Sequence, residues 1–138
     1  MRQSIADLMT RDLVTCPPDA DIRTAAARMR DDDIGDVVVV EGEAVRGIVT
    51  DRDIAVRAVA EGRGPDTRLA DVLSGDVVTV APEDRIEVVV DLMRERAIRR
   101  IPVVDDGRLV GIVSIGDLAI ERDPDSALAD ISAARENS

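Results

Sequence analysis

Two stretches of the chain decide its fold: Gly47-Ile48-Val49-Thr50-Asp51-Arg52-Asp53 and Gly111-Ile112-Val113-Ser114-Ile115-Gly116-Asp117. Each has a glycine, two aliphatic residues, a hydroxyl residue and, three positions later, an aspartate. They lie 64 residues apart (111 minus 47). The same shift aligns residues 5–55 with 69–119 without a gap, and 17 of these 51 pairs are identical. A gapless match of this length indicates two copies of one structural unit.

Each copy predicts the order β-α-β-β-α after a short leading helix. Apolar residues recur at helical spacing, β-branched runs indicate buried strands, and glycine-containing turns predict a hairpin. Acids at Asp19 and Glu83 favour the start of the first long helix. The predicted ranges, for the two copies in turn, are a leading helix over 5–9 and 69–73, a strand over 13–16 and 77–81, hairpin strands over 37–40 with 45–49 and 101–104 with 109–113, and a last helix from 50 and from 114.

We therefore expect an α/β (α+β) fold of two β-α-β-β-α repeats packed with pseudo-twofold symmetry. Repeat 1 is expected at 3–62, a linker at 63–68, repeat 2 at 69–123, and a partly helical tail at 124–138. A single repeat would have a marginal core, so the two are expected to pack together.

The composition argues against several classes of function. The 138 residues include no Phe, Tyr, Trp, His or Lys, and the net charge is −11. A nucleic-acid partner is not expected without a basic footprint or aromatic platforms. Histidine-dependent nucleophiles and ordinary zinc sites are disfavoured, and Cys16 is expected to be a small buried hydrophobe. No apolar run reaches membrane-spanning length, so we expect a cytoplasmic protein. Because histidine and paired cysteines are missing and no paired carboxylates stand out, we do not expect an enzyme.

The repeat, the two motifs and Arg100-Ile101-Pro102-Val103-Val104-Asp105 together resemble a tandem pair of cystathionine β-synthase-type (CBS) domains. The resemblance spans roughly residues 3–123 and is strongest to stand-alone bacterial two-CBS proteins of the hypoxic or stress-response type. It implies a non-enzymatic regulatory module that acts as an energy or stress sensor. The implied ligand contains adenosine (AMP, ADP, ATP, NAD or S-adenosylmethionine) and binds in two clefts between the repeats, with no cofactor required.

The resemblance also implies roles for particular residues. Asp53 and Asp117 would accept hydrogen bonds from ribose hydroxyls, with Thr50 and Ser114 near ribose or phosphate. Arg100 would contact phosphate, and apolar residues beside the proline-containing strand, represented by Ile101 and Pro102, would flank adenine. The residues alone allow another interpretation, because Thr50-x-x-Asp53 and Ser114-x-x-Asp117 are also ordinary capping boxes. Without aromatic residues adenine gains no stacking, so modest affinity or a vestigial site is expected.

The two copies are not expected to bind equally. Arg99-Arg100 in repeat 2 corresponds to Gly35-Asp36 in repeat 1, and an acid at that position would repel a phosphate. We expect tighter binding at Arg100, Ser114 and Asp117, although the arginine pair is also consistent with a solvated helix end. Arg52 and Arg57 would either compensate in repeat 1 or lie on a helix surface.

The alternative function is a protein-interaction or oligomerisation module with vestigial nucleotide clefts. We expect a homodimer, in addition to a protein partner that the sequence does not identify. The apolar residues that would pack against a second copy, or else within the subunit, are Ile54, Val56, Ala58, Leu118 and Ile120, with Leu128 and Ile131 of the tail crossing to the partner.

Overall fold

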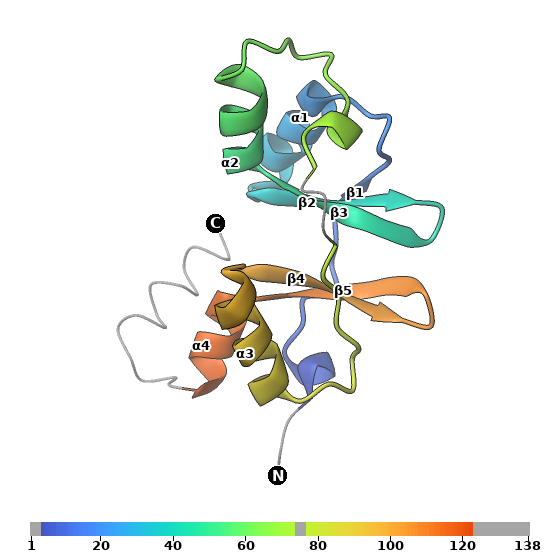
Figure 1. The fold of residues 1–138 in the computed structure, drawn as a ribbon. Coiled ribbons are helices and arrows are strands. Elements are labelled where there is room, and N and C mark those ends of the chain that lie inside the picture. The colour runs from blue at the N-terminus through green and yellow to red at the C-terminus, as the bar shows by residue number, and fades with distance from the viewer. Residues whose placement is uncertain (1–3, 74–76, 123–138) are drawn as a thin grey trace. The chain divides into compact units, whose positions relative to one another are not determined.

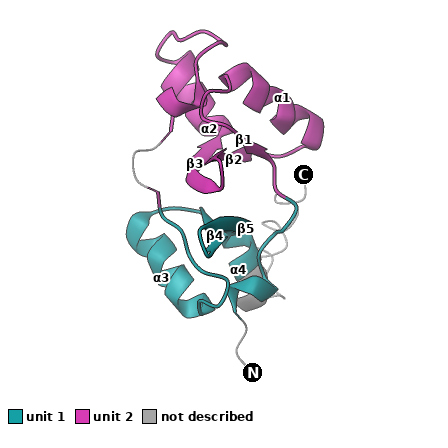
Figure 2. Ribbon diagram, turned by 90° about the vertical axis from the view of Figure 1, so that its right-hand side faces the viewer, with its two compact units in different colours: residues 1–12, 78–138 teal, residues 13–77 magenta. Residues whose placement is uncertain are grey.

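The computed structural model describes residues 4–73 and 77–122. The chain divides into two compact units, shown in Figure 2. Residues 13–77 form unit 2, and residues 1–12 together with 78–138 form unit 1. The division does not follow the sequence repeats, because each unit contains the body of one repeat and the leading segment of the other.

Unit 2 is a three-stranded sheet with helices on one side (Figure 1). Strand β2 lies in the centre, parallel to β1 and antiparallel to β3. The elements are β1 (Thr15–Cys16), α1 (Ile22–Asp32), β2 (Asp36–Glu41), β3 (Ala44–Thr50), α2 (Asp51–Asp53), the π-helix η2 (Ile54–Val59) and the 3-10 helix η3 (Leu69–Asp71). The π-helical hydrogen bonds Ala60 N to Ala55 O (2.9 Å) and Arg63 N to Ala58 O (2.9 Å) widen the helix that follows the first motif.

Unit 1 repeats this plan around a two-stranded sheet. Its elements are the 3-10 helix η1 (Ile5–Asp7), α3 (Ile86–Arg96), β4 (Arg100–Asp105), β5 (Arg108–Ser114) and α4 (Ile115–Arg122). The counterpart of β1 is a single parallel bridge between Val80 and Val103. Both hairpins have the same register and the same irregularity, after Val39 and after Val103.

The predicted mixture of helices and small sheets is confirmed, with differences in detail. The leading helices predicted over 5–9 and 69–73 are three-residue 3-10 helices, Ile5–Asp7 and Leu69–Asp71. The leading strands predicted over 13–16 and 77–81 shrink to two residues and to one bridge. Each is a short edge segment that ends at a proline, which cannot donate a ladder hydrogen bond. The first long helix begins at Ile22, three residues after Asp19, and its N-cap is Asp21, because the Asp21 carboxylate accepts from Thr24 N (2.8 Å). Helix α3 has Arg85 at this position and no side-chain cap.

Each core depends on a leading segment from the other repeat. Ile5 and Met9 belong to the core of unit 1, and Leu69 and Val72 belong to the core of unit 2. The strand runs Val37–Val39 and 101–103 are fully buried, as their continuous apolar character predicts. Neither repeat therefore contains its whole core within its own stretch of sequence.

The motif glycines make room for these leading segments. A Cβ at Gly111 would lie 2.6 Å from Met9 Sδ and 3.0 Å from Thr10 O. A Cβ at Gly47 would lie 3.1 Å from Leu73 Cδ2, and Gly47 also has a φ of +154°, which L-residues rarely adopt. Met9 and Leu73 are equivalent under the 64-residue shift (9 plus 64), so the same close approach occurs in both units.

Candidate functional site

Each unit gathers a small set of polar side chains where its hairpin leads into the last helix. The hairpin register places Asp36 opposite Thr50 in unit 2 and Arg100 opposite Ser114 in unit 1. We call Asp36, Thr50, Asp53 and Arg57 the unit 2 polar set, and Arg100, Ser114 and Asp117 the unit 1 polar set. Strand β2 thus presents an acid beside the Thr50 hydroxyl, and strand β4 presents a base beside the Ser114 hydroxyl.

The hydroxyl and the aspartate of each motif form a capping box, as one of the two sequence interpretations predicts. In unit 2, Asp53 N donates to Thr50 Oγ1 (3.0 Å), and Thr50 N donates to Asp53 Oδ2 (2.9 Å). In unit 1, Asp117 N donates to Ser114 Oγ (3.1 Å), and Ser114 N donates to Asp117 Oδ2 (3.0 Å). The box holds each aspartate in place through the backbone amide of the strand end.

The second carboxylate oxygen distinguishes the two aspartates. Asp53 Oδ1 lies 3.6 Å from Arg57 Nε, and the Asp53 side chain is 20% exposed. In unit 1 the Ser114 hydroxyl also donates to Asp117 Oδ2 (3.0 Å), so both Ser114 donors use the same oxygen. Among the described residues, no hydrogen bond or ion pair reaches Asp117 Oδ1.

The first amide of each final helix already has a backbone partner. Asp51 N donates to Gly35 O (3.0 Å), and Ile115 N donates to Arg99 O (2.8 Å). Together with the capping boxes, these bonds use most of the donors that a helix start would offer to an anion. An anionic group at unit 1 would therefore depend on arginine side chains more than on the helix end.

The remaining residues of the predicted binding set lie on opposite faces of β4. Ile101 is fully buried in the core of unit 1. Because side chains alternate along a strand, Arg100 and Pro102 lie on the other face, where Pro102 is paired with Ile112. The structure therefore brings Arg100, Ser114 and Asp117 together, and it directs the Ile101 side chain away from them.

The apolar residues considered for self-association separate into two groups. Ala58 and Leu118 are core residues, 0% and 2% exposed, whereas Val56 is 49% exposed. Val59, which the sequence interpretation did not include, is 67% exposed on the same helix. The side chain of Ile120 and the tail residues Leu128 and Ile131 lie outside the described part of the chain.

Cys16 is a buried thiol in unit 2, as predicted. Burial raises the pKa of the Cys16 thiol above its ordinary value, so it stays neutral near pH 7. Within residues 4–73 and 77–122, no cluster of three or more potential metal ligands is found. None of the helices in these ranges combines the length and the apolar character needed to cross a bilayer.

Comparison with known proteins identifies the repeat. The family description "CBS domain" matches residues 5–59 and 69–122. The CBS domain-containing protein YhcV of Bacillus subtilis is 40% identical over 133 residues, covering 94% of this chain and 95% of YhcV. Hypoxic response protein 1 of Mycobacterium tuberculosis is 38% identical over 109 residues, covering 77% of this chain and 76% of that protein.

Solved structures share the fold. Hypoxic Response Protein I with two coordinated zinc ions matches with a TM-score of 0.77 and 29% identity, over 85% of this chain and 97% of that one. A hexameric CBS-CP12 protein from bloom-forming cyanobacteria matches with 0.79 and 28%, over 99% and 81%. The CBS domain pair of protein MJ0100, in complex with 5′-methylthioadenosine and S-adenosyl-L-methionine, matches with 0.81 and 24%, over 91% and 100%.

Proposed function

Because the chain belongs to the CBS-domain family and consists of two such domains, we propose that it is a cytoplasmic, non-enzymatic sensor of an adenosine-containing ligand. The ligand binds at the unit 1 polar set. The observation that carries the proposal is the register of β4 and β5, which places Arg100 beside Ser114. Asp117 follows Ser114 by three residues, in the first turn of α4.

The unit 1 polar set offers chemistry for both ends of a nucleotide. Asp117 Oδ1 accepts hydrogen bonds from the adjacent hydroxyls of a ribose, because a carboxylate oxygen has two lone pairs. The guanidinium of Arg100 forms charge-assisted bonds with a phosphate, and exposed Arg99 adds positive charge. Pro102, which is buried, and half-buried Ile112 are the aliphatic residues on the same face of the sheet.

The charge of the strand residue that lies opposite the motif hydroxyl, Asp36 or Arg100, selects among adenosine derivatives. Arg100 favours the phosphorylated ligands AMP, ADP, ATP and NAD over neutral nucleosides at unit 1. Asp36 takes this position in unit 2 and disfavours a phosphate there. The fold itself accommodates adenosine derivatives in protein MJ0100, which supports the ligand class. The ligand regulates by stabilising whichever conformation binds it more tightly.

Calorimetric titration of the intact protein with AMP tests the proposal. We expect Asp117→Ala and Arg100→Ala each to weaken AMP binding by about tenfold or more, the loss of one charge-assisted contact. Asp53→Ala and Asp36→Ala are the matched controls in unit 2 and should leave the affinity for AMP within about twofold. A titration with adenosine separates the phosphate-binding role of Arg100 from the ribose-binding role of Asp117, because Arg100→Ala should weaken AMP binding far more than adenosine binding.

Two results would overturn this assignment. Wild-type protein that shows no heat with millimolar AMP, ADP or ATP would exclude the ligand class and leave the interaction module of the alternative interpretation. Loss of AMP binding in Asp53→Ala, with Arg100→Ala unaffected, would place the ligand at the other polar set.

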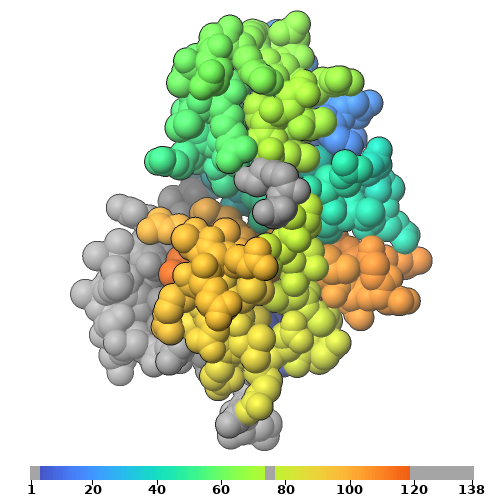
Figure 3. Space-filling view, in the orientation of Figure 1, coloured from blue at the N-terminus to red at the C-terminus, as the bar shows by residue number. Residues whose placement is uncertain are grey.

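We also propose that the protein forms a homodimer through η2. Val56 and Val59 of this helix are 49% and 67% exposed. The helix itself lies at the surface, in green, in Figure 3. Light scattering should show a dimer for the wild type and a monomer for Val59→Asp. Val88→Asp is the matched control, because Val88 is a valine of α3 with 55% exposure. A dimer that survives Val59→Asp would exclude this surface.

A further inference from the structure

We propose that Arg57 is a specificity-determining residue that closes the unit 2 polar set to a ribose diol by occupying the carboxylate of Asp53. The inference rests on the proposed function, since it takes from there the pairing of the motif aspartate with ribose. It concerns a different residue and a different unit, so its test is separate from that of the AMP site.

The Asp53 carboxylate is engaged at both oxygens. Oδ2 accepts from Thr50 N (2.9 Å), and Oδ1 lies 3.6 Å from Arg57 Nε. A diol that binds Asp53 in the way proposed for Asp117 needs Oδ1 as its acceptor. It would have to displace the guanidinium first.

Arg57 is held toward Asp53 from a second side. Its Nη1 donates to Leu73 O (3.4 Å), the carbonyl of the leading segment that packs into unit 2. The two contacts use different nitrogens of one planar group, which restricts the guanidinium to the neighbourhood of Asp53 Oδ1.

The corresponding carboxylate in unit 1 lacks such a neighbour in the sequence. The 64-residue shift takes Arg57 to position 121 (57 plus 64), which is a glutamate. A glutamate cannot form an ion pair with Asp117. Both repeats therefore keep the capping aspartate, and the residue four positions later decides whether its second oxygen is available to a ligand.

Titration with adenosine, followed by amide NMR, tests this inference. Adenosine carries no phosphate, so Asp36 and Arg100 have little influence on the comparison. The amides of Thr50 and Asp53 report binding at unit 2, and those of Ser114 and Asp117 report binding at unit 1. Arg57→Leu removes the guanidinium and keeps an aliphatic helix-forming side chain.

We expect Arg57→Leu to tighten adenosine binding at unit 2 by roughly two- to fivefold, the range that an exposed ion pair is worth, and to leave unit 1 unchanged. Arg52→Leu is the matched control. It removes the same charge from a neighbouring position, and within the described residues no hydrogen bond or ion pair joins the Arg52 side chain to Asp53. Adding Asp53→Ala to Arg57→Leu should abolish the gain.

The outcomes distinguish this inference from the proposed function. Equal effects of Arg57→Leu and Arg52→Leu, or no gain at the Thr50 and Asp53 amides, would overturn the role of Arg57 while leaving the unit 1 site intact. If wild-type protein binds no nucleotide at unit 1, the proposed function fails. A gain of adenosine binding in Arg57→Leu would still support the role of Arg57, and its absence would exclude it.

Discussion

Unit 1 and unit 2 share a hairpin register, a sheet irregularity and a capping box, yet the strand residue beside the motif hydroxyl is basic in unit 1 and acidic in unit 2. Asp36 stands beside the hydroxyl in unit 2, and Arg100 stands there in unit 1. The shared residues are those that the backbone requires, because a strand that leads into a helix needs a cap in both copies. The residues that differ lie beside the cap, where they alter ligand chemistry without altering the fold.

The largest expected effect is on the free energy of unfolding, and it tests whether Ile101 of unit 1 is a core residue or a ligand contact. Ile101→Ala should lower the free energy of unfolding by about 2–4 kcal/mol, because Ile101 is fully buried. Ile101→Val should cost about 1 kcal/mol and leave AMP affinity unchanged, since the side chain lies on the face opposite Arg100. Urea unfolding and calorimetry measure the two quantities. Wild-type stability with lost binding would instead make Ile101 a ligand contact.

Substituting the motif glycines tests how closely the leading segment packs in each unit. Gly111→Ala should lower the free energy of unfolding by about 1–3 kcal/mol, because the added methyl meets Met9 and the Thr10 carbonyl. Gly47→Ala meets only Leu73, but it adds backbone strain at a φ of +154°.

Double-mutant cycles distinguish these two causes. Met9→Ala should recover part of the loss in Gly111→Ala, and Leu73→Ala should recover less of the loss in Gly47→Ala, because backbone strain would remain. Strict additivity in both cycles would argue against the steric explanation.

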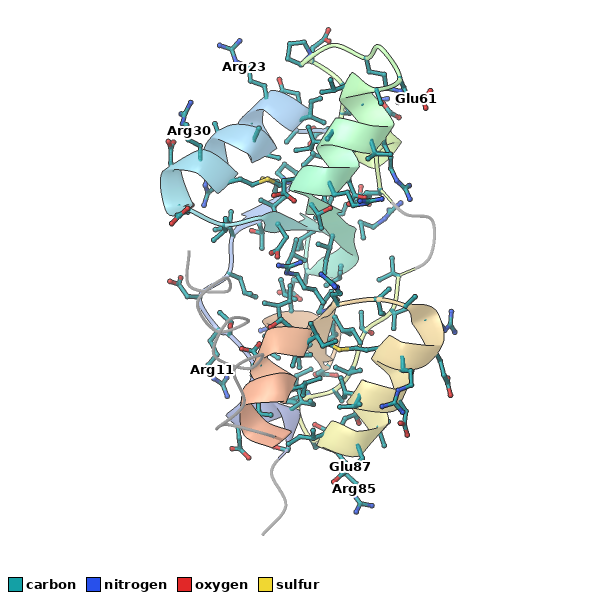
Figure 4. The ribbon with its side chains drawn as sticks, turned by 90° about the vertical axis from the view of Figure 1, so that its left-hand side faces the viewer. Arg11, Arg23, Arg30, Glu61, Arg85 and Glu87 are labelled. Carbon is teal, nitrogen blue, oxygen red and sulfur yellow. The ribbon has the colours of Figure 1, made fainter. Side chains whose placement is uncertain are left out.

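The first long helices differ in their N-caps. Asp21 caps α1, whereas Arg85 at the start of α3 has no side-chain cap bond and projects outward in Figure 4. Arg85→Asp should raise the free energy of unfolding by about 0.5–1 kcal/mol, by capping α3 and by placing an acid at its positive end. Arg85→Ala is the control that removes the charge without adding a cap, and an equal gain there would refute the capping explanation.

The smallest expected effect is the pH dependence of the existing cap. Hydrogen bonds from the Thr24 hydroxyl (2.7 Å) and amide lower the pKa of Asp21 below its ordinary value of 3.8. The stability that the ionised carboxylate contributes is therefore complete at neutral pH and is lost as the pH falls below 3.8 through the lowered pKa. Urea midpoints between pH 7 and pH 3 should converge for wild type and Asp21→Ala at the acid end. A constant difference would contradict the assignment.

Much of the fold and part of the site could be predicted from sequence. The hairpin strands lie close to their predicted ranges and the last helices begin within one residue of their predicted starts, because β-branched runs and helical spacing are local signals. The N-cap of α1 shows the limit, because the acid at Asp19 indicated that a helix starts nearby without identifying Asp21 as the capping residue. The sequence interpretation also placed Ile101 beside adenine, whereas its side chain is buried in the core of unit 1. A buried strand has two apolar faces, and the sequence does not say which one supports the site.

The sequence alone determined that there are two copies of one unit and that each carries a capping aspartate, since repetition and capping are properties of short segments. Tertiary structure decided that each leading segment completes the core of the other repeat, and it placed Arg57 between Asp53 and Leu73 O. Such contacts join residues far apart in the chain, and a close approach like that of Met9 to Gly111 is set by packing in three dimensions. The availability of a carboxylate oxygen to a ligand is therefore a property of the folded unit.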